Sequence, residues 1–467
     1  MSRQCGNFGV FGRKIRRPGR LPLILALLAL AGLLSAGVAR AVPATLLWQD
    51  LSGTLGGDNN LATGVAALGS KVYVAFSFSD ASHVWWGQVR IYDAKKGSIL
   101  WSSDIFNLNG GRTAGIAVAG SSAYVAGYYG VAGSGNEEVF LRTYDASGKK
   151  GLKGESHTGA PMAGLYPTGV KALGSKVVAF SNSESSPGVV RGSIAGFSSK
   201  TGAYIWGADY GESWQNLLSS KVNDIAVSGS SVAVAGYQQT SDGYKWFNVS
   251  QYSAVNGSYV TGNGSRGSTY SVENEALAVS WTGSVIGAAG YRTDDFGNSY
   301  AHAARIIAKG KGAGMTTLED FDLGYGDQRF NAVVVTKSRI YVAGYGLASL
   351  TEQPALTRSY DPKSGKLVDY TMYELSALGG MVTTGIAAGK SGIYVAGSGL
   401  ESPGVTDWFV KGFNTNLSER WLQDLNAFDQ DTNKALGVTA SSSAIVAVGQ
   451  VKDTDGKMRA AVQAYGP

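Results

Sequence analysis

A short pattern of small apolar residues, a Gly/Ser turn and a β-branched segment recurs along almost the entire chain. Residues Thr63–Ala75 read TGVAALGSKVYVA, and residues Ala114–Gly127 read AGIAVAGSSAYVAG. Successive copies begin 51 to 56 residues apart when they are aligned on Gly64, Gly115, Gly169, Asp224, Ala276, Ala332, Gly385 and Gly437. Self-similarity at a fixed period of this length is typical of repeat architectures.

Each copy contains four segments with the composition of short β-strands. They are represented by Gly385–Ala388 (GIAA), Ile340–Gly344 (IYVAG), Trp408–Phe413 (WFVKGF) and Ser98–Trp101 (SILW). Gly, Asp, Pro and Ser separate the segments, as expected for turns between strands. Four strands per unit of about 50 residues indicate the blades of a β-propeller. Small residues suit its innermost strand, where neighbouring backbones crowd together.

The two ends of the repeat region complement each other. The last copy stops at Ala464–Pro467, where its fourth strand should begin, and Leu46–Leu51 (LLWQDL) matches the fourth-strand segment Trp421–Leu425 (WLQDL). An N-terminal strand that completes the last blade would remove an open sheet edge. We therefore predict an all-β fold, a single eight-bladed β-propeller closed by its N-terminal strand. Seven blades with one extra unit is the alternative.

The first 41 residues differ from the rest of the chain. A basic segment is followed by the apolar run Leu21–Leu34 and by the small-residue site Ala39–Ala41. This order predicts a secretory signal peptide over residues 1–41 and a mature propeller domain of eight repeats over residues 42–467. An uncleaved membrane anchor is the alternative, because the apolar stretch is long enough to span a bilayer. We expect a protein exported to the periplasm or the extracellular space, without a membrane span once the signal is cleaved.

Removing the first 41 residues changes the charge balance. The whole chain has a formal net charge of +6, but this segment holds seven of its 40 Lys and Arg residues and none of its 34 acidic residues. The mature domain is thus close to neutral, which argues against a nucleic-acid partner. The single cysteine, Cys5, also lies in this segment. The mature domain therefore has no cysteine for a disulfide, a metal ligand or a nucleophile. We also expect the protein to be a monomer.

The repeats resemble those of the bacterial β-propeller-repeat (SBBP-type) family. The likeness is carried by Gly115–Val118, Ile340–Gly344 and Asp407–Lys411, and it extends over all eight copies. Two segments, Tyr92–Trp101 and Ser199–Trp206, are also similar to the tryptophan-docking units of pyrroloquinoline-quinone propellers. Those enzymes typically place a vicinal cysteine pair over the cofactor, and this chain has no such pair. We expect the tryptophans of these units to pack between blades: Trp48, Trp101, Trp206 and Trp421.

Few residues have the spacing of a catalytic or metal site. The three histidines, His83, His157 and His302, fall in different repeats, so we expect surface or loop histidines rather than a cluster. Asp429–Asn433 has the oxygen spacing of a calcium loop but lacks its Gly and its final acid, which favours a polar loop. Asp453–Gly456 is typical of a hairpin turn. We predict no cofactor, with calcium or a quinone as the alternatives.

Two sets of residues are candidates for ligand binding. Polar residues precede the innermost strands and would surround one mouth of the central channel, as a ligand platform or as a hydrated rim: Asn60, Arg112, Asn223, Glu275, Arg329 and Lys434. Tyrosines follow the Ala-Gly that ends several second strands: Tyr128, Tyr237, Tyr291 and Tyr345. An arc of tyrosines suits a recognition surface, and packing on the neighbouring blade is the alternative.

These observations favour a non-catalytic binding or scaffold module over an enzyme. We expect its partner to be a protein, a glycan or a component of the cell envelope. The alternative is an enzyme on the same scaffold, a quinone-dependent oxidoreductase or a lyase. Scattered histidines and the lack of a mature-domain cysteine support the first interpretation, while a propeller by itself is compatible with both.

Overall fold

A computed structural model of the protein describes residues 44–52, 56–82, 84–130, 137–157, 166–186, 188–211, 217–265, 273–308, 313–324, 326–349, 352–373, 380–402, 405–424, 433–453 and 455–467. The chain divides into two units, Met1–Ala41 and Val42–Pro467, and every described residue belongs to the second. All regular elements in these ranges are β-strands. Among the described residues no helix has the length and apolarity needed to cross a membrane. The expected signal peptide lies outside the described residues.

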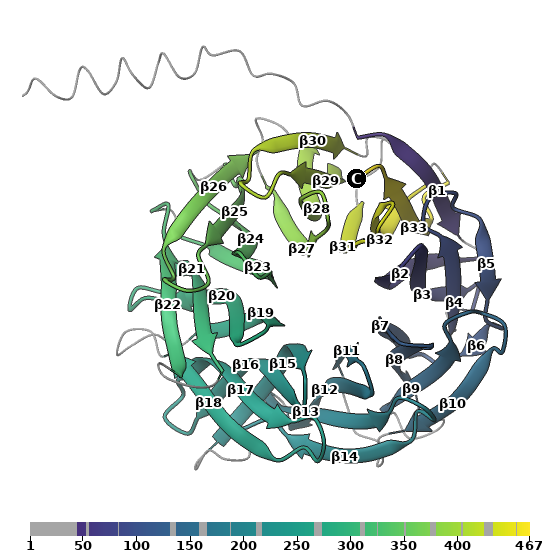
Figure 1. The fold of residues 1–467 in the computed structure, drawn as a ribbon, viewed down its shortest axis with the longest axis horizontal. Coiled ribbons are helices and arrows are strands. Elements are labelled where there is room, and N and C mark those ends of the chain that lie inside the picture. Colours follow the sequence, from purple (N-terminus) through teal and green to yellow (C-terminus); the bar gives the residue numbers. More distant parts are fainter. Residues whose placement is uncertain are drawn as a thin grey trace, which may run out of the picture. The chain divides into compact units, whose positions relative to one another are not determined.

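The strands form eight sheets arranged around a ring (Figure 1). Blade 1 contains β2 (Gly56–Leu68), β3 (Lys71–Asp80), β4 (Trp85–Asp93) and β5 (Ile99–Ser102), with β6 (Phe106–Asn107) beside β4. Blade 2 contains β7 (Arg112–Ala119), β8 (Ser122–Gly130), β9 (Glu137–Asp145) and β10 (Leu152–His157). Blade 3 contains β11 (Tyr166–Leu173), β12 (Lys176–Ser186), β13 (Val189–Ser198) and β14 (Tyr204–Asp209). Blade 4 contains β15 (Leu217–Ser228), β16 (Ser231–Thr240), β17 (Lys245–Ser253) and β18 (Tyr259–Ser265).

The second half of the ring follows the same plan. Blade 5 contains β19 (Asn274–Thr282), β20 (Val285–Thr293), β21 (Ser299–Ile307) and β22 (Gly314–Phe321). Blade 6 contains β23 (Gln328–Val335), β24 (Ile340–Gly346), β25 (Ala355–Tyr360) and β26 (Leu367–Tyr373). Blade 7 contains β27 (Val382–Ala388), β28 (Ile393–Ser402), β29 (Val405–Phe413) and β30 (Glu419–Asp424). Blade 8 contains β31 (Lys434–Ala440), β32 (Ile445–Lys452) and β33 (Met458–Tyr465), and its fourth strand is β1 (Leu46–Ser52).

The ring is closed by pairing between the two ends of the propeller domain. The antiparallel register of β1 on β33 runs from Leu46 opposite Tyr465 to Ser52 opposite Ala460. The strand at the outer edge of blade 8 therefore comes from the opposite end of the sequence (Figure 1). The structure confirms the predicted eight-bladed propeller and its closure, and it excludes the seven-bladed alternative.

Every inner strand carries a β-bulge at the same place, near its middle. The residues that resume pairing after the bulge are Gly64, Gly115, Gly169, Asp224, Ala278, Ala332, Gly385 and Gly437. Seven of them are the residues used to align the repeats in the sequence. In the fifth repeat the structure corrects Ala276 to Ala278, because Ala276 is in the last of the three pairs that precede the bulge of β19. A Cβ on Gly64 would stand 2.9 Å from the Cα of Gly115, so neighbouring inner strands require small residues at this point.

The bulges also connect successive blades. A bulge displaces one residue from the backbone ladder of its sheet and changes the direction of its side chain. That side chain can then bond to the neighbouring blade. Asn331 Nδ2 in blade 6 donates to the Thr383 carbonyl of blade 7 at 2.9 Å, and Thr384 Oγ1 in blade 7 donates to the Ala435 carbonyl of blade 8 at 2.9 Å. The inner ring is thus held by side-chain hydrogen bonds as well as by apolar contacts.

The predicted inter-blade packing of the tryptophans is confirmed. The Trp48 ring of blade 8 lies over Gly97 in blade 1, and its Nε1 donates to the Ala94 carbonyl at 2.9 Å. Trp101 and Trp206 cover the equivalent glycines of the next blades, Gly148 and Gly257. Trp421 lies beside Tyr465 of blade 8, with ring centroids 5.9 Å apart. These tryptophans therefore belong to the core between blades.

Candidate functional site

One face of the ring gathers both sets of candidate binding residues. Inner strands begin and second strands end on the same side, because the two strands are antiparallel. Arg112 is opposite Tyr128 in the register, and three more pairs share this position: Lys221 with Tyr237, Glu275 with Tyr291, and Arg329 with Tyr345. Lys434 lies at the same place, opposite Gln450. We call this side of the ring the mouth face.

The register adjusts the predicted polar ring. Arg112, Glu275, Arg329 and Lys434 are equivalent residues, whereas Asn60 lies one position earlier, opposite Phe78, and Asn223 is a bulged residue. Lys221 lies at the equivalent position but was not among the predicted residues, although the sequence contains a signal for it. Each cation or acid of this set stands sixteen positions before its tyrosine, and Lys221 has that separation from Tyr237.

Glu275 is the centre of a charged cluster between blades 4 and 5. Its side chain is buried, with 8% of the residue exposed. Its carboxylate accepts hydrogen bonds from Lys221 Nζ at 3.0 Å, Asn223 Nδ2 at 2.7 Å and the Tyr291 hydroxyl at 3.1 Å. Two of these donors come from the preceding blade, so the cluster joins the two blades at the mouth. Burial and the Glu275 charge raise the pKa of Tyr291 well above its ordinary value, and Tyr291 stays a donor.

A second cluster continues from blade 5 into blade 6. The Arg329 guanidinium lies 4.4 Å from the centroid of the Tyr291 ring, and its Nε donates to Asp327 Oδ1 at 2.9 Å. The Tyr345 hydroxyl donates to Asp327 Oδ2 at 3.0 Å. Burial raises the pKa of Tyr345 to about 12. The mouth face therefore carries a continuous series of cations, acids and phenols over three blades.

The arc of tyrosines is largely covered. Tyr237, Tyr291 and Tyr345 are each less than a tenth exposed, and Tyr128 is half-buried. Lys245 Nζ lies 4.9 Å from the Tyr237 ring centroid. These positions agree with the packing alternative, since all three rings are buried and two of them lie under a cation of the protein itself. Their role in recognition stays a prediction.

The remaining residues of the polar ring differ in exposure. Asn60 is buried and donates from Nδ2 to the Met458 carbonyl of blade 8 at 2.7 Å. Asn223 donates to the Ala276 carbonyl of blade 5 at 2.8 Å. Arg112 and Lys434 are exposed, and the Arg112 guanidinium lies 4.1 Å from the Trp85 ring centroid. Asn60 and Asn223 therefore hold blades together, while Arg112 and Lys434 are accessible at the mouth.

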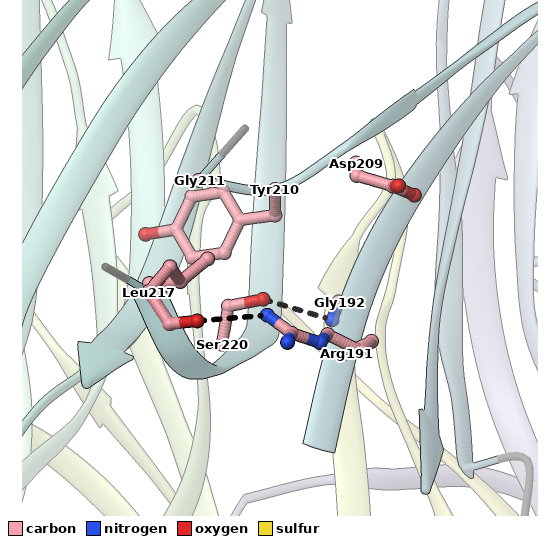
Figure 2. A pocket seen from close by; sticks show the side chains of 7 residues that line it. All are labelled: Arg191, Gly192, Asp209, Tyr210, Gly211, Leu217 and Ser220. Atoms are coloured by element: carbon pink, nitrogen blue, oxygen red, sulfur yellow. Dashed lines mark hydrogen bonds between the residues drawn. The ribbon is translucent and has the colours of Figure 1, made fainter. Parts of the chain in front are cut away.

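A pocket of about 270 Å³ opens on the mouth face between blades 3 and 4. It is lined by Arg191, Gly192, Asp209, Tyr210, Gly211, Leu217 and Ser220. Figure 2 shows Arg191 extending from β13 toward β15, where it donates to the Leu217 carbonyl at 3.4 Å. The Gly192 amide donates to Ser220 Oγ at 3.2 Å. No sequence motif pointed to this pocket, because its lining residues come from strand ends in two blades.

Unpaired amide groups lie behind one wall of the pocket. Gln238 is fully buried, and neither its Nε2 nor its Oε1 has a hydrogen-bond partner among the described residues. A Cβ on the pocket residue Gly211 would stand 3.0 Å from Gln238 Nε2. Asn248 accepts from the Tyr210 hydroxyl at 2.8 Å, but its Nδ2 lacks an acceptor in the same described part of the chain. Buried polar groups are normally paired, so these amides leave hydrogen-bonding capacity next to the pocket.

The two described histidines lie in different blades, His157 in blade 2 and His302 in blade 5. His302 was expected to be a surface or loop residue, whereas it lies within β21 and is fully buried. The side chain of His157, the last residue of β10, is about a third exposed, and its Nε2 lies 3.6 Å from Glu155 Oε1. His83 lies outside the described residues. Burial of His302 follows from contacts with blade 4 that the sequence does not reveal.

The two calcium candidates have different outcomes. Of Asp429–Asn433 only Asn433 is described, and it is buried and donates its amide hydrogen bond to Asp407 Oδ1 at 3.3 Å. Asp453 and Asp455 belong to a hairpin turn, as predicted, and both bind Arg459. In the part of the chain that the structure describes, no group of three or more His, Cys, Asp or Glu residues could hold a metal ion.

Comparison with known proteins identifies the fold and no family. No family model and no curated protein matches the chain. It is similar to the quinohemoprotein alcohol dehydrogenase from Comamonas testosteroni, with a TM-score of 0.53 and 10% identity over 91% of this chain and 76% of that chain. The quinohemoprotein alcohol dehydrogenase ADHIIG from Pseudomonas putida HK5 is similar at a TM-score of 0.51, with the same identity and coverage. At this identity the likeness extends to the propeller fold alone.

Proposed function

We propose that the protein is an exported binding module that holds a polar ligand in the pocket between blades 3 and 4. The observation that carries this proposal is the combination of donors and acceptors in one concave site. Arg191 and Asp209 are exposed at the pocket, Tyr210 and Ser220 are buried in its wall, and the Gln238 amide lies behind it. A site that offers both donors and acceptors suits a neutral ligand rich in hydroxyl groups.

A glycan has the chemistry that this pocket favours among the partners considered. Each sugar hydroxyl donates and accepts, so it can bond to a guanidinium and a carboxylate at the same time. Ligand pockets usually measure roughly 300–1,000 Å³, so a cavity of about 270 Å³ suits one sugar ring of a longer chain. The remaining sugars of the oligosaccharide would extend over the mouth face on the side of the exposed Arg191. A glycan partner is compatible with export, which the leader pattern and the resemblance to bacterial propeller repeats support.

Binding to a glycan array, followed by calorimetry with the best oligosaccharide, tests the proposal. We expect Arg191→Ala and Asp209→Asn each to weaken binding at least tenfold, with little change in melting temperature because both side chains are exposed. Lys200→Ala is the matched control, since Lys200 lines a pocket at the turns on the opposite face. Lack of binding to any glycan, or an equal loss of affinity in the Lys200→Ala control, would contradict the proposal. Capture of a defined envelope protein through Arg191 would support a binding module whose ligand is a protein and not a glycan.

The fold is equally compatible with an enzyme, and the quinone-dependent alternative has its own test. Tryptophans docked on turn glycines and the similarity to quinohemoprotein propellers are shared features of architecture. Absorbance of the purified protein, with and without added pyrroloquinoline quinone and calcium, measures cofactor binding directly. Stoichiometric binding of the quinone would favour an oxidoreductase, and the proposal that the pocket binds a glycan would then be withdrawn.

A further inference from the structure

A serine, a histidine and an aspartate are brought together at the outer part of the seam between blades 4 and 5. Ser265 ends β18 of blade 4, while His302 and Asp320 face each other across β21 and β22 of blade 5. Ser265 Oγ lies 3.5 Å from His302 Nε2, and His302 Nδ1 lies 2.5 Å from Asp320 Oδ1. Neither the candidate pocket nor the polar ring includes these residues.

The environment of His302 holds it as a neutral base of defined orientation. The imidazole is fully buried and lies edge-on to Phe247, with ring centroids 4.6 Å apart. Because Asp320 accepts the hydrogen bond at Nδ1, the lone pair of Nε2 is directed at the Ser265 hydroxyl. Burial lowers the pKa of His302, against the opposing effect of Asp320. The ring is therefore uncharged and ready to accept a proton at neutral pH.

Asp320 is fixed in turn by a further charge. Arg292 donates to its Oδ2 at 3.2 Å. The pKa of Asp320 is lowered because the His302 hydrogen bond and the nearby charges outweigh its burial. The groups facing the imidazole are thus Ser265 and Phe247 from blade 4 and Asp320 from blade 5, with Arg292 beyond the carboxylate. The side chain of Ser265 is half-buried and that of Asp320 is exposed, so solvent reaches both ends of this chain of contacts while His302 between them is buried.

We propose that Ser265, His302 and Asp320 form a nucleophile, a general base and a positioning residue that cleave carboxylic esters. Ser265 Oγ attacks the ester carbonyl carbon while its proton passes to His302 Nε2. His302 returns that proton to the departing alkoxide as the carbon–oxygen bond breaks, which leaves an acyl-serine and an alcohol. Water then attacks the acyl-serine with His302 as base, releasing the acid and restoring the hydroxyl. The same order of roles is found in serine hydrolases on unrelated folds. A serine–histidine distance of 3.5 Å is in the range seen before substrate binds.

Covalent labelling of the full-length protein with a fluorophosphonate probe tests the proposal. We expect mass spectrometry to locate the phosphonyl group on Ser265, and Ser265→Ala to abolish labelling at an unchanged melting temperature. Ser258→Ala is the matched control, because Ser258 is an exposed serine in the turn of the same blade. We expect p-nitrophenyl acetate to give a burst of p-nitrophenol in the parent and the control, and none in Ser265→Ala.

The role of Asp320 is separated from a purely structural role by kinetics. Asp320→Asn should slow labelling at least tenfold and shift its pH dependence, while the fold is retained. In the parent, the labelling rate should rise as the pH passes through the lowered pKa of His302 and then level off. An unlabelled parent, labelling that persists in Ser265→Ala, or an Asp320→Asn variant with the parent's rate and pH profile would overturn the proposal, and the three residues would then serve only to join blades 4 and 5.

Discussion

Single tyrosines connect neighbouring blades in this protein. Tyr73 in β3 donates to the Ala146 carbonyl in the turn of blade 2 at 2.8 Å. Tyr124 in blade 2 bonds to the equivalent turn of blade 3 at Ser199, and Tyr341 in blade 6 bonds to that of blade 7 at Thr415. In each case an apolar ring fills the seam and its hydroxyl satisfies a carbonyl. A second-strand tyrosine that bonds to the turn of the next blade is therefore a structural residue here.

Alkaline pH should unfold the protein through these phenols. Burial, followed by the Asp145 charge, raises the pKa of Tyr73 from 10.0 to about 12, and burial raises that of Tyr345 to a similar value. Stability linked to a raised pKa is complete below the unfolded value and is lost as the pH rises toward the folded value. We therefore expect stability to fall between about pH 10 and 12. Tyrosinate absorbance should rise together with the loss of far-ultraviolet circular dichroism; ionisation well before unfolding would contradict the prediction.

Residues in repeated motifs could be predicted from the sequence, whereas residues that meet between blades could not. The docking tryptophans were predicted because each lies in a repeated local motif. His302, Asp320 and Ser265 were not, since three strands of two blades bring them together and no repeated motif marks them. Lys221 could have been predicted from its separation of sixteen residues from Tyr237. The pocket between blades 3 and 4 could not, because it depends on strand ends that differ between blades. Local periodicity determines the blades, and the sites arise where blades meet.

At the level of the strand, the inner-strand bulge is the device that all eight blades share. It displaces one residue from the ladder and turns its side chain toward the next blade. Asn223, Asn331 and Thr384 use this position for hydrogen bonds across the seam. Leu436 occupies the same position in blade 8 and is exposed. At Asn223, Asn331 and Thr384 the bulge thus also provides a hydrogen-bonded connection between blades.

Replacing a polar bulge residue should weaken the ring by the value of one hydrogen bond. Asn331→Ala removes the donor to the Thr383 carbonyl, and we expect a loss of about 1 kcal/mol in the free energy of unfolding. Leu436→Ala is the matched control at the equivalent bulge and should change stability by less than about 0.5 kcal/mol. Urea denaturation followed by circular dichroism measures both. An equal loss in the two variants would mean that the bulge residue acts through packing alone.

For the whole molecule, β1 belongs to blade 8 by pairing and also contacts blade 1. Asp50 accepts from Arg90 at 3.0 Å and from the Tyr92 hydroxyl at 2.6 Å, and Trp48 bonds to Ala94. One seven-residue strand therefore completes a sheet and fastens it to the first blade. The strand therefore contributes both to the outer edge of blade 8 and to its junction with blade 1.

Removing this strand should destabilise the entire propeller. A mature-domain variant without residues 42–52 exposes the edge of β33 and loses the contacts to Arg90 and Tyr92, so we expect a lower melting temperature with a single transition. A synthetic peptide of residues 44–52 should restore part of the loss, and a scrambled peptide of the same composition should not. An unchanged melting temperature in the truncated protein would show that the ring is held without β1.

The pairing of Leu46 with Tyr465 also has a consequence in time. A ribosome makes the chain from its N-terminus, so β1 is finished first and its partner strand last. For nearly the whole period of synthesis β1 has no sheet to join, and the growing blades present a free edge. The ring is sealed only once β33 has been made, so the first strand of the propeller waits for the last.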